Sequence, residues 1–132
     1  MSELRADTIT ASNGTSPVTL TKQSAAKAWV NLNGTSTIAI RGSTGVASIF
    51  DNGTGDYTIT FSNAMTDTNY APTAASDTNN SFGVQTTNMF VSATSNATVA
   101  PTTTAYRVST RESSGAARDE TYVLTSAHGD LA

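Results

Sequence analysis

The stretch VASIFDNGTGDYTITF, residues 46–61, decides the fold of this chain. In its second half, the large side chains of Tyr57, Ile59 and Phe61 alternate with polar aspartate and threonine. Such alternation is the two-residue period of a β-strand with one face in a core and the other in water. The stretch therefore predicts a half-buried strand over residues 56–61.

The turn residues DNGTG, residues 51–55, separate this strand from the β-type run VASIF. Asparagine and glycine tolerate the positive φ angles that tight hairpin turns need, so the two runs are expected to pair as a hairpin. Pairing Phe50 with Tyr57 places Val46 opposite Phe61 on the same face of the sheet.

The tripeptide Asn-Gly-Thr occurs at residues 13–15, 33–35 and 52–54. The second copy lies between KAWVNL and STIAIR, where Val30 and Ile38 are expected to face the core. Two of the three copies therefore predict hairpin corners, and the first copy, which follows DTITAS, fits the same pattern.

Asn-x-Ser/Thr is also the acceptor pattern for N-glycosylation, and Asn79 and Asn96 fit it as well. The first ten residues, MSELRADTIT, contain no apolar run of the kind found in signal peptides. We therefore expect turns at these asparagines rather than glycan acceptors.

The chain divides into an N-terminal arm, residues 1–26, and a body, residues 27–132. The arm has only four large aliphatic side chains, which are too few to close a core. The body predicts an all-β, antiparallel sandwich or barrel, because short β-type runs follow one another between turn signals. The expected strands are 27–32, 36–41, 46–50, 56–61, 69–75, 82–86, 88–94, 104–111 and 121–126. Residues 92–104 also read as a long loop or weak edge strand, and residues 112–120 as a polar hairpin tip.

The composition excludes several classes of protein. Net charge is −3, and the seven Lys and Arg residues are scattered, which disfavours binding to a nucleic-acid backbone. No apolar run approaches the ~20 residues that a membrane helix needs. The absence of cysteine excludes disulfides and thiolate metal sites. Val, Leu, Ile and Phe make up only about 17% of the chain, so the core is thin and burial between subunits favours an oligomer.

The best metal candidate is DNGTGD, in which Asp51 and Asp56 flank a flexible loop. A calcium loop needs oxygen-bearing side chains at alternate positions, but the third and fifth positions here are Gly53 and Gly55. An acidic turn is the preferred interpretation, and no metal or cofactor is expected.

Catalytic residues are not expected either. The one histidine, His128, lies in AHGDLA near the end of the sequence, without the motif of a nucleophile and an orienting acid. Asp119 and Glu120 are adjacent, so on a strand they would face opposite ways and would not share a proton.

The aromatic residues mostly fall on alternating positions, and a place in the core is the default expectation for them. A Tyr or Trp that was instead exposed beside a loop would be able to stack on a sugar. These aromatic residues are Trp29, Phe50, Tyr57, Phe61, Tyr70, Phe82, Phe90, Tyr106 and Tyr122.

Several segments carry a resemblance to a known group of proteins. SELRADTIT (2–10), KAWVNLNGT (27–35), DNGTGDYTITFSNAM (51–65), the pair NY (69–70) and the ending GDLA (129–132) resemble small tail-fibre or fibre-like virion proteins of tailed bacteriophages. The resemblance covers most of the chain, although residues 74–104 carry no matching motif. Its motifs are structural, and none is catalytic.

The resemblance implies a structural virion protein rather than an enzyme. It implies an arm that docks on other phage tail or capsid proteins, a β body that faces outward, and a homotrimer. The expected role is a short tail fibre or receptor-binding fibre, with a host surface glycan or protein as its partner. A capsid decoration protein or head fibre is the alternative. A small carbohydrate-active enzyme is disfavoured because the sequence shows no paired acid and base.

Overall fold

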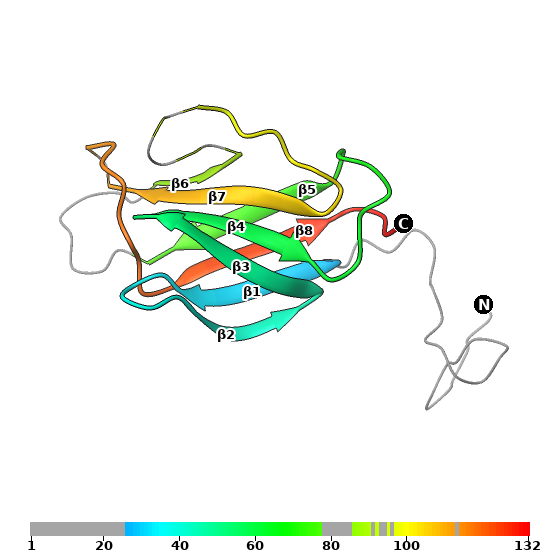
Figure 1. Ribbon diagram of the computed structural model, residues 1–132, viewed down its shortest axis with the longest axis horizontal. Coiled ribbons are helices and arrows are strands. Elements are labelled where there is room, and N and C mark those ends of the chain that lie inside the picture. Colours follow the sequence, from blue (N-terminus) through cyan, green and yellow to red (C-terminus); the bar gives the residue numbers. More distant parts are fainter. Residues whose placement is uncertain (1–25, 78–85, 91, 93–94, 96, 113) are drawn as a thin grey trace, which may run out of the picture.

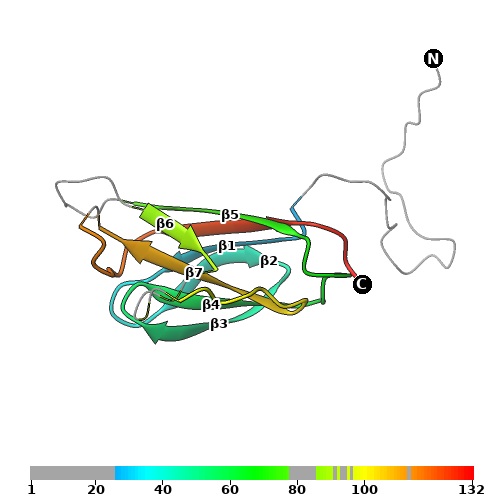
Figure 2. The ribbon, with the colours of Figure 1, turned by 90° about the horizontal axis from the view of Figure 1, so that it is seen from above.

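The body of the protein is a sandwich of two sheets (Figures 1 and 2). The computed structural model describes residues 26–77, 86–90, 92, 95, 97–112 and 114–132. This part of the chain forms two antiparallel four-stranded sheets, one in the order β2-β1-β8-β5 and the other in the order β3-β4-β7-β6. The predicted all-β antiparallel sandwich is confirmed. Residues 1–25 of the arm lie outside the described residues.

The strands of the first sheet are β1 (Ala28–Asn33), β2 (Ala39–Thr44), β5 (Ala71–Ser76) and β8 (Val123–His128). Those of the second sheet are β3 (Val46–Gly53), β4 (Asp56–Phe61), β6 (Thr86–Met89) and β7 (Ala105–Arg111). Within the described ranges there is no helix of the length and apolar character that a membrane crossing requires.

The hairpin between β3 and β4 forms where the sequence predicts it, with a different register. Val46 lies opposite Phe61 as expected, but Phe50 lies opposite Thr58 rather than Tyr57. The reason is that the pairing shifts near both ends of β3. Phe50 consequently faces away from the core and is 65% exposed, so its predicted burial is wrong.

The hairpin at Asn33-Gly34 also forms, because β1 and β2 pair antiparallel. Its connection spans residues 34–38, and β2 begins at Ala39 rather than at the predicted residue 36. The left-handed position in this connection is Ser36, with φ 59°, so the corner is longer than a two-residue Asn-Gly turn.

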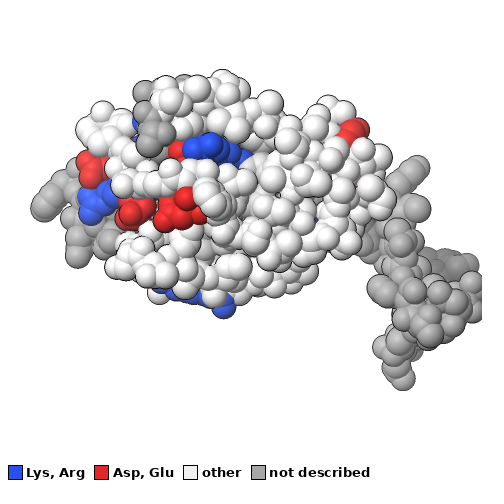
Figure 3. Space-filling model, viewed as in Figure 1, with Lys and Arg blue, Asp and Glu red and all other residues white. Residues whose placement is uncertain are grey.

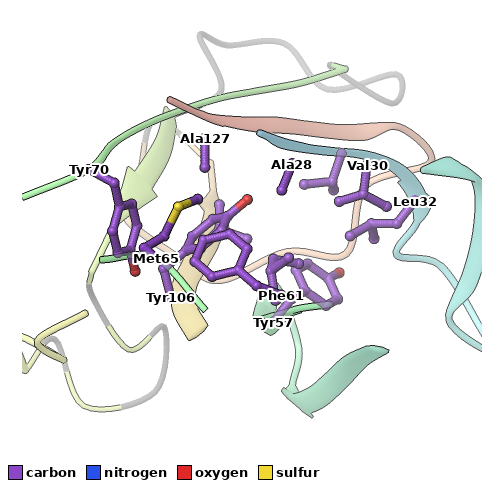
Figure 4. Close-up of a cluster of buried hydrophobic side chains, with 12 residues drawn as sticks. Ala28, Val30, Leu32, Tyr57, Phe61, Met65, Tyr70, Tyr106 and Ala127 are labelled. Carbon is purple, nitrogen blue, oxygen red and sulfur yellow. The ribbon is translucent and has the colours of Figure 1, made fainter. Parts of the chain in front are cut away.

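The core lies between the two sheets and contains residues from both (Figure 4). The predicted burial of Val30, Ile59 and Phe61 is confirmed, whereas Ile38 is half-buried against the core. The buried hydrophobic residues are Ala28, Val30, Leu32, Tyr57, Ile59, Phe61, Met65, Tyr70, Tyr106, Val108, Val123 and Ala127. Four aromatic rings thus fill a large share of a core that has few aliphatic side chains.

Three of the predicted core aromatics are exposed instead: Trp29, Phe50 and Tyr122. Trp29 alternates with buried Val30 along β1, so it necessarily points outward. Phe90 is half-buried against the core, and Phe82 lies outside the described residues.

The segment of residues 112–120 is not the tip of a hairpin between β7 and β8, although an isolated antiparallel bridge between Arg111 and Ala117 closes a tight turn within it. It joins β7 of the second sheet to β8 of the first, so it crosses from one layer of the sandwich to the other. The expected strands 82–86 and 88–94 fall largely outside the described residues. Among the residues of this region that the structure describes, 86–89 form β6.

The two ends of the sandwich differ. The chain enters the body beside its own last strand, because the Lys27 amide donates to the Ala127 carbonyl at 2.8 Å. The β1–β2 connection, the β3–β4 turn and residues 112–120 lie together at the opposite end, on the left in Figure 1. We call this group of segments the loop end.

Candidate functional site

Charged side chains gather at the loop end. Figure 3 shows acidic and basic groups interleaved there, while much of the remaining visible surface carries neutral side chains. Contacts across long sequence separations hold the loop end together: the Gly34 amide donates to the Glu120 carbonyl, and the Gly55 amide donates to the Asp119 carboxylate. Metal binding and acid–base chemistry both need charged or titratable groups, so the loop end contains the candidate residues for such chemistry.

Asp56, one of the two carboxylates of the metal candidate DNGTGD, is fully buried at the start of β4. The Arg107 guanidinium donates to both of its oxygens, from Nε at 2.6 Å and from Nη2 at 2.9 Å. The Ser92 hydroxyl donates to the second oxygen at 3.2 Å. These hydrogen bonds to Asp56 also raise the pKa of Arg107. A carboxylate held by a guanidinium fork is a structural ion pair, because the fork occupies the positions that a cation would take.

Asp51, the other metal candidate, is exposed and closes its own turn. Its Oδ1 accepts a hydrogen bond from the Gly53 amide at 2.8 Å. The acidic loop therefore uses its two carboxylates separately, Asp51 in the turn and Asp56 in the ion pair. Among the described residues, no group of three or more His, Asp or Glu side chains is placed to hold a metal ion.

Asp119 links the loop end to the core. Its Oδ1 accepts from the Gly55 amide at 2.6 Å and from the Tyr57 hydroxyl at 3.0 Å. The Tyr57 hydroxyl also lies close to Gly34, where a Cβ would stand 2.2 Å from it. Glycine at position 34 therefore serves close approach, in addition to the turn role that the sequence predicts for it. Burial, and next the hydrogen bond to Asp119, raises the pKa of Tyr57.

Glu120 has no exposed surface, although its neighbour Asp119 is half-buried. Burial raises the pKa of Glu120, and nearby Asp77 adds to that effect. The Arg118 guanidinium, with Nε 3.7 Å from Oε1, acts in the opposite direction. Asp119 and Glu120 lie outside any strand, so the expectation of opposite strand faces does not apply to them. They nevertheless have different neighbours: Asp119 accepts from Gly55 and Tyr57, whereas Glu120 lies near Arg118.

His128 lies at the end of β8, exposed, opposite Ala71 of β5. It is at the end of the sandwich away from the charged loops, since β8 runs from the loop end toward the C-terminus. His128 therefore lies at the opposite end of the sandwich from the acidic candidates of the sequence analysis, which are Asp51, Asp56, Asp119 and Glu120.

A second feature lies on the outer face of the first sheet, which is the face of β1, β8 and β5 turned away from the core. The residues pointing outward there include Trp29, Asn31, Leu124, Ser126, His128, Thr73 and Ala75. Some of them surround a shallow hollow of about 380 Å³, lined in part by Trp29, Thr73 and Leu124.

The neighbouring rim of this face carries a further aromatic group. The Arg41 guanidinium lies 4.2 Å from the centre of the Tyr122 ring and donates to the carbonyls of Leu32 and Thr121. Such stacking holds the ring in place at an exposed site. The sequence alone did not assign which aromatic residues are exposed. The signal for this outer face was the two-residue alternation, because Trp29 alternates with Val30 and Leu124 alternates with Val123 in the same way.

The described residues define an antiparallel β-sandwich with a charged loop end and, on the outer face of its first sheet, a hollow lined by uncharged residues that include Trp29. No family model matches this chain, and no curated protein or solved structure matches it either.

Proposed function

We propose that this protein is a structural virion protein of a tailed bacteriophage and acts as a short tail fibre or receptor-binding fibre, not as an enzyme. Residues 1–26 attach it to tail or capsid proteins, and the β body faces outward as part of a homotrimer. The proposal rests on the sequence resemblance and, among the structural observations, chiefly on one.

That observation is the polarity of the sandwich. The Lys27 amide bonds to the Ala127 carbonyl, so an arm that precedes residue 27 leaves the body at one end. The loop end lies at the other end of the sandwich, as Figures 1 and 2 both show, and Figure 3 shows its charged groups. This layout supports a protein anchored at the arm end with its loops presented away from the anchor, which is where recognition residues are commonly found.

The use of charge supports a structural role as well. Asp56 pairs with Arg107, and Arg118 pairs with Glu112 at 2.7 Å. These side chains stabilise the loop end through contacts with each other. A surface that is otherwise largely neutral suits recognition by shape and hydrogen bonds rather than by long-range attraction.

Localisation on the particle tests this proposal directly. Antibodies against residues 27–132 with gold label are expected to mark the tail tip or tail sides of virions at low copy number. Labelling distributed over the capsid lattice would instead favour the decoration protein or head fibre. Absence of the protein from purified particles would overturn the virion proposal altogether.

The proposed attachment through the arm is tested by removing residues 1–26 and by transferring them to another protein. A protein lacking residues 1–26 is expected to fold and yet fail to join particles. Residues 1–26 fused to an unrelated soluble protein are expected to join them. Incorporation of the shortened protein at the normal level would show that the body carries the attachment.

A further inference from the structure

The hollow on the outer face of the first sheet has a floor of hydroxyl groups. Ser126 of β8 lies directly between Trp29 of β1 and Thr73 of β5 in the strand register. The hydroxyls of Ser126 and Thr73 are 2.9 Å apart and hydrogen-bonded, and they lie at the exposed surface. One such bond uses one donor, so the pair retains another donor and several acceptor lone pairs for a ligand.

An indole ring forms one wall of the hollow. Trp29 is 42% exposed, and the far edge of its six-membered ring lies near Gly42 of the neighbouring strand β2. There, a Cβ on Gly42 would stand 3.5 Å from the far edge of the ring, so glycine leaves the space above β2 open to the ring. On the other side of the floor, the small side chain of Ala75 keeps the rim low, and Leu124 closes one end.

The residues that line the hollow are all uncharged. They offer an aromatic surface, aliphatic contacts and a hydroxyl pair, and the volume of about 380 Å³ lies in the usual range of small-ligand sites. An uncharged ligand that has apolar C–H faces and many hydroxyl groups matches each of these properties. Sugars are the class of ligand with that combination.

We propose that this hollow binds a neutral glycan, with a sugar ring against Trp29 and its hydroxyls bonded to Ser126 and Thr73. The site deepens the proposed function, on which it rests for the origin of the glycan at the host surface. The hollow lies on the flank of the sandwich, so it remains open when the arm end is attached to a particle.

A second copy of the chain is the competing occupant of this face. Half-exposed Trp29 and Leu124 are its large apolar side chains, and the positions between and beside them are small or polar. A stable interface of about 800 Å² per partner needs a broader apolar centre. The concave shape and the hydroxyl floor therefore favour a small polar ligand.

The single tryptophan of the chain makes a direct test possible, because all indole fluorescence comes from Trp29. The full-length protein is titrated with neutral oligomers of glucose, galactose, mannose and N-acetylglucosamine, and with sialylated and sulfated oligosaccharides for comparison. We expect a saturable fluorescence change with at least one neutral oligomer and none with the charged ones. No change with any neutral oligomer, or binding of the charged ones only, would overturn the proposal.

Variants locate the site, with binding measured by calorimetry. Trp29→Ala is expected to weaken binding about tenfold or more, as loss of a stacking contact does. Ser126→Ala is expected to weaken it several-fold, whereas Phe50→Leu, which removes an exposed aromatic ring on the other sheet and keeps an apolar side chain there, leaves it unchanged. Equal binding by Trp29→Ala, or dissociation of an oligomer by that variant, would overturn the proposal; the latter would assign the face to a second copy.

The outcomes for this site and for the proposed function are separable. Binding by the isolated protein requires no particle, and gold labelling of particles requires no glycan. Glycan binding by a protein that is absent from virions would refute the virion role alone. A labelled tail with no glycan binding would refute the site alone.

Discussion

The hydroxyl of Tyr57 donates to the carboxylate of Asp119 at 3.0 Å and thereby ties the second sheet to the segment that crosses between the layers. Tyr57 is fully buried and its hydroxyl also reaches the Gly34 carbonyl at 3.3 Å, so one side chain contacts two connections. Neither contact is local in sequence. The loop end is therefore held in shape by a buried group at its base, not only by its surface ion pairs.

Removal of that hydroxyl is expected to destabilise the protein. Tyr57→Phe should lower the free energy of unfolding by about 1.5–3 kcal/mol, because a hydrogen bond to a charged acceptor is lost. The measurement is urea unfolding followed by circular dichroism. The matched control is Tyr122→Phe, whose ring is exposed, with an expected change within about 0.5 kcal/mol. Equal changes in the two variants would contradict the role given to Tyr57.

Phe61 is expected to be the most sensitive position of the aromatic core. Its ring centre lies 5.3 Å from those of Tyr70 and Tyr106, and its side chain is buried. Phe61→Ala should cost roughly 3–5 kcal/mol of unfolding free energy if the site does not collapse. Phe61→Leu, which keeps most of the volume, should cost less than about 1.5 kcal/mol. An unchanged urea midpoint for Phe61→Ala would show that the core adapts without loss.

The ion pair between Asp56 and Arg107 gives a prediction about buried charge. Arg107→Leu leaves the buried carboxylate of Asp56 without its guanidinium, so it should cost about 3–5 kcal/mol. Adding Asp56→Asn removes the charge itself, and the double variant is expected to recover part of that loss. Urea unfolding of all four combinations measures the coupling. Strictly additive changes would mean that the two side chains do not depend on each other.

Stability is expected to fall in alkaline solution. Burial raises the pKa of Tyr70 and of Tyr106 to about 12, and that of Tyr57 is raised as well. In the unfolded chain these phenols release their protons near pH 10. Between about pH 10 and 12 the unfolded state therefore binds fewer protons than the folded state, and rising pH favours unfolding. Urea midpoints across this interval, with tyrosinate absorbance as a second signal, check the direction; a constant midpoint would contradict it.

The sequence could predict the strands whose pattern is local. Tyr57, Ile59 and Phe61 alternate within one strand, and each is buried as expected. The same reasoning misplaced Phe50 because it assumed a regular ladder, and irregular pairing near the ends of β3 shifts that residue outward. Nothing in the composition of VASIF reports such a shift, since it depends on the geometry of the partner strand.

The contacts of the loop end could not be predicted from local sequence patterns, for a different reason. Asp119 meets Gly55 across 64 residues, and the segment that carries it was expected to be a hairpin tip. Which sheet a strand joins is decided by packing of whole layers, so β7 and β8 could not be assigned to different sheets from their own residues. The hollow beside Trp29 has the same origin, because three strands from distant parts of the sequence supply its sides.

The last prediction concerns assembly. A chain with a thin aliphatic core gains stability when subunits cover more of its apolar surface, and the proposed fibre role implies a homotrimer. Light scattering is expected to give three times the 13.6 kDa mass of one chain. Phe50, the most exposed large hydrophobic residue of the described part, lies on the outer face of the second sheet and is the expected contact. Phe50→Ser should shift the trimer toward monomer upon dilution, whereas Phe50→Leu should not. A stable monomer of the unaltered protein at micromolar concentration would contradict the trimer, and an unaltered trimer for Phe50→Ser would place its contacts elsewhere.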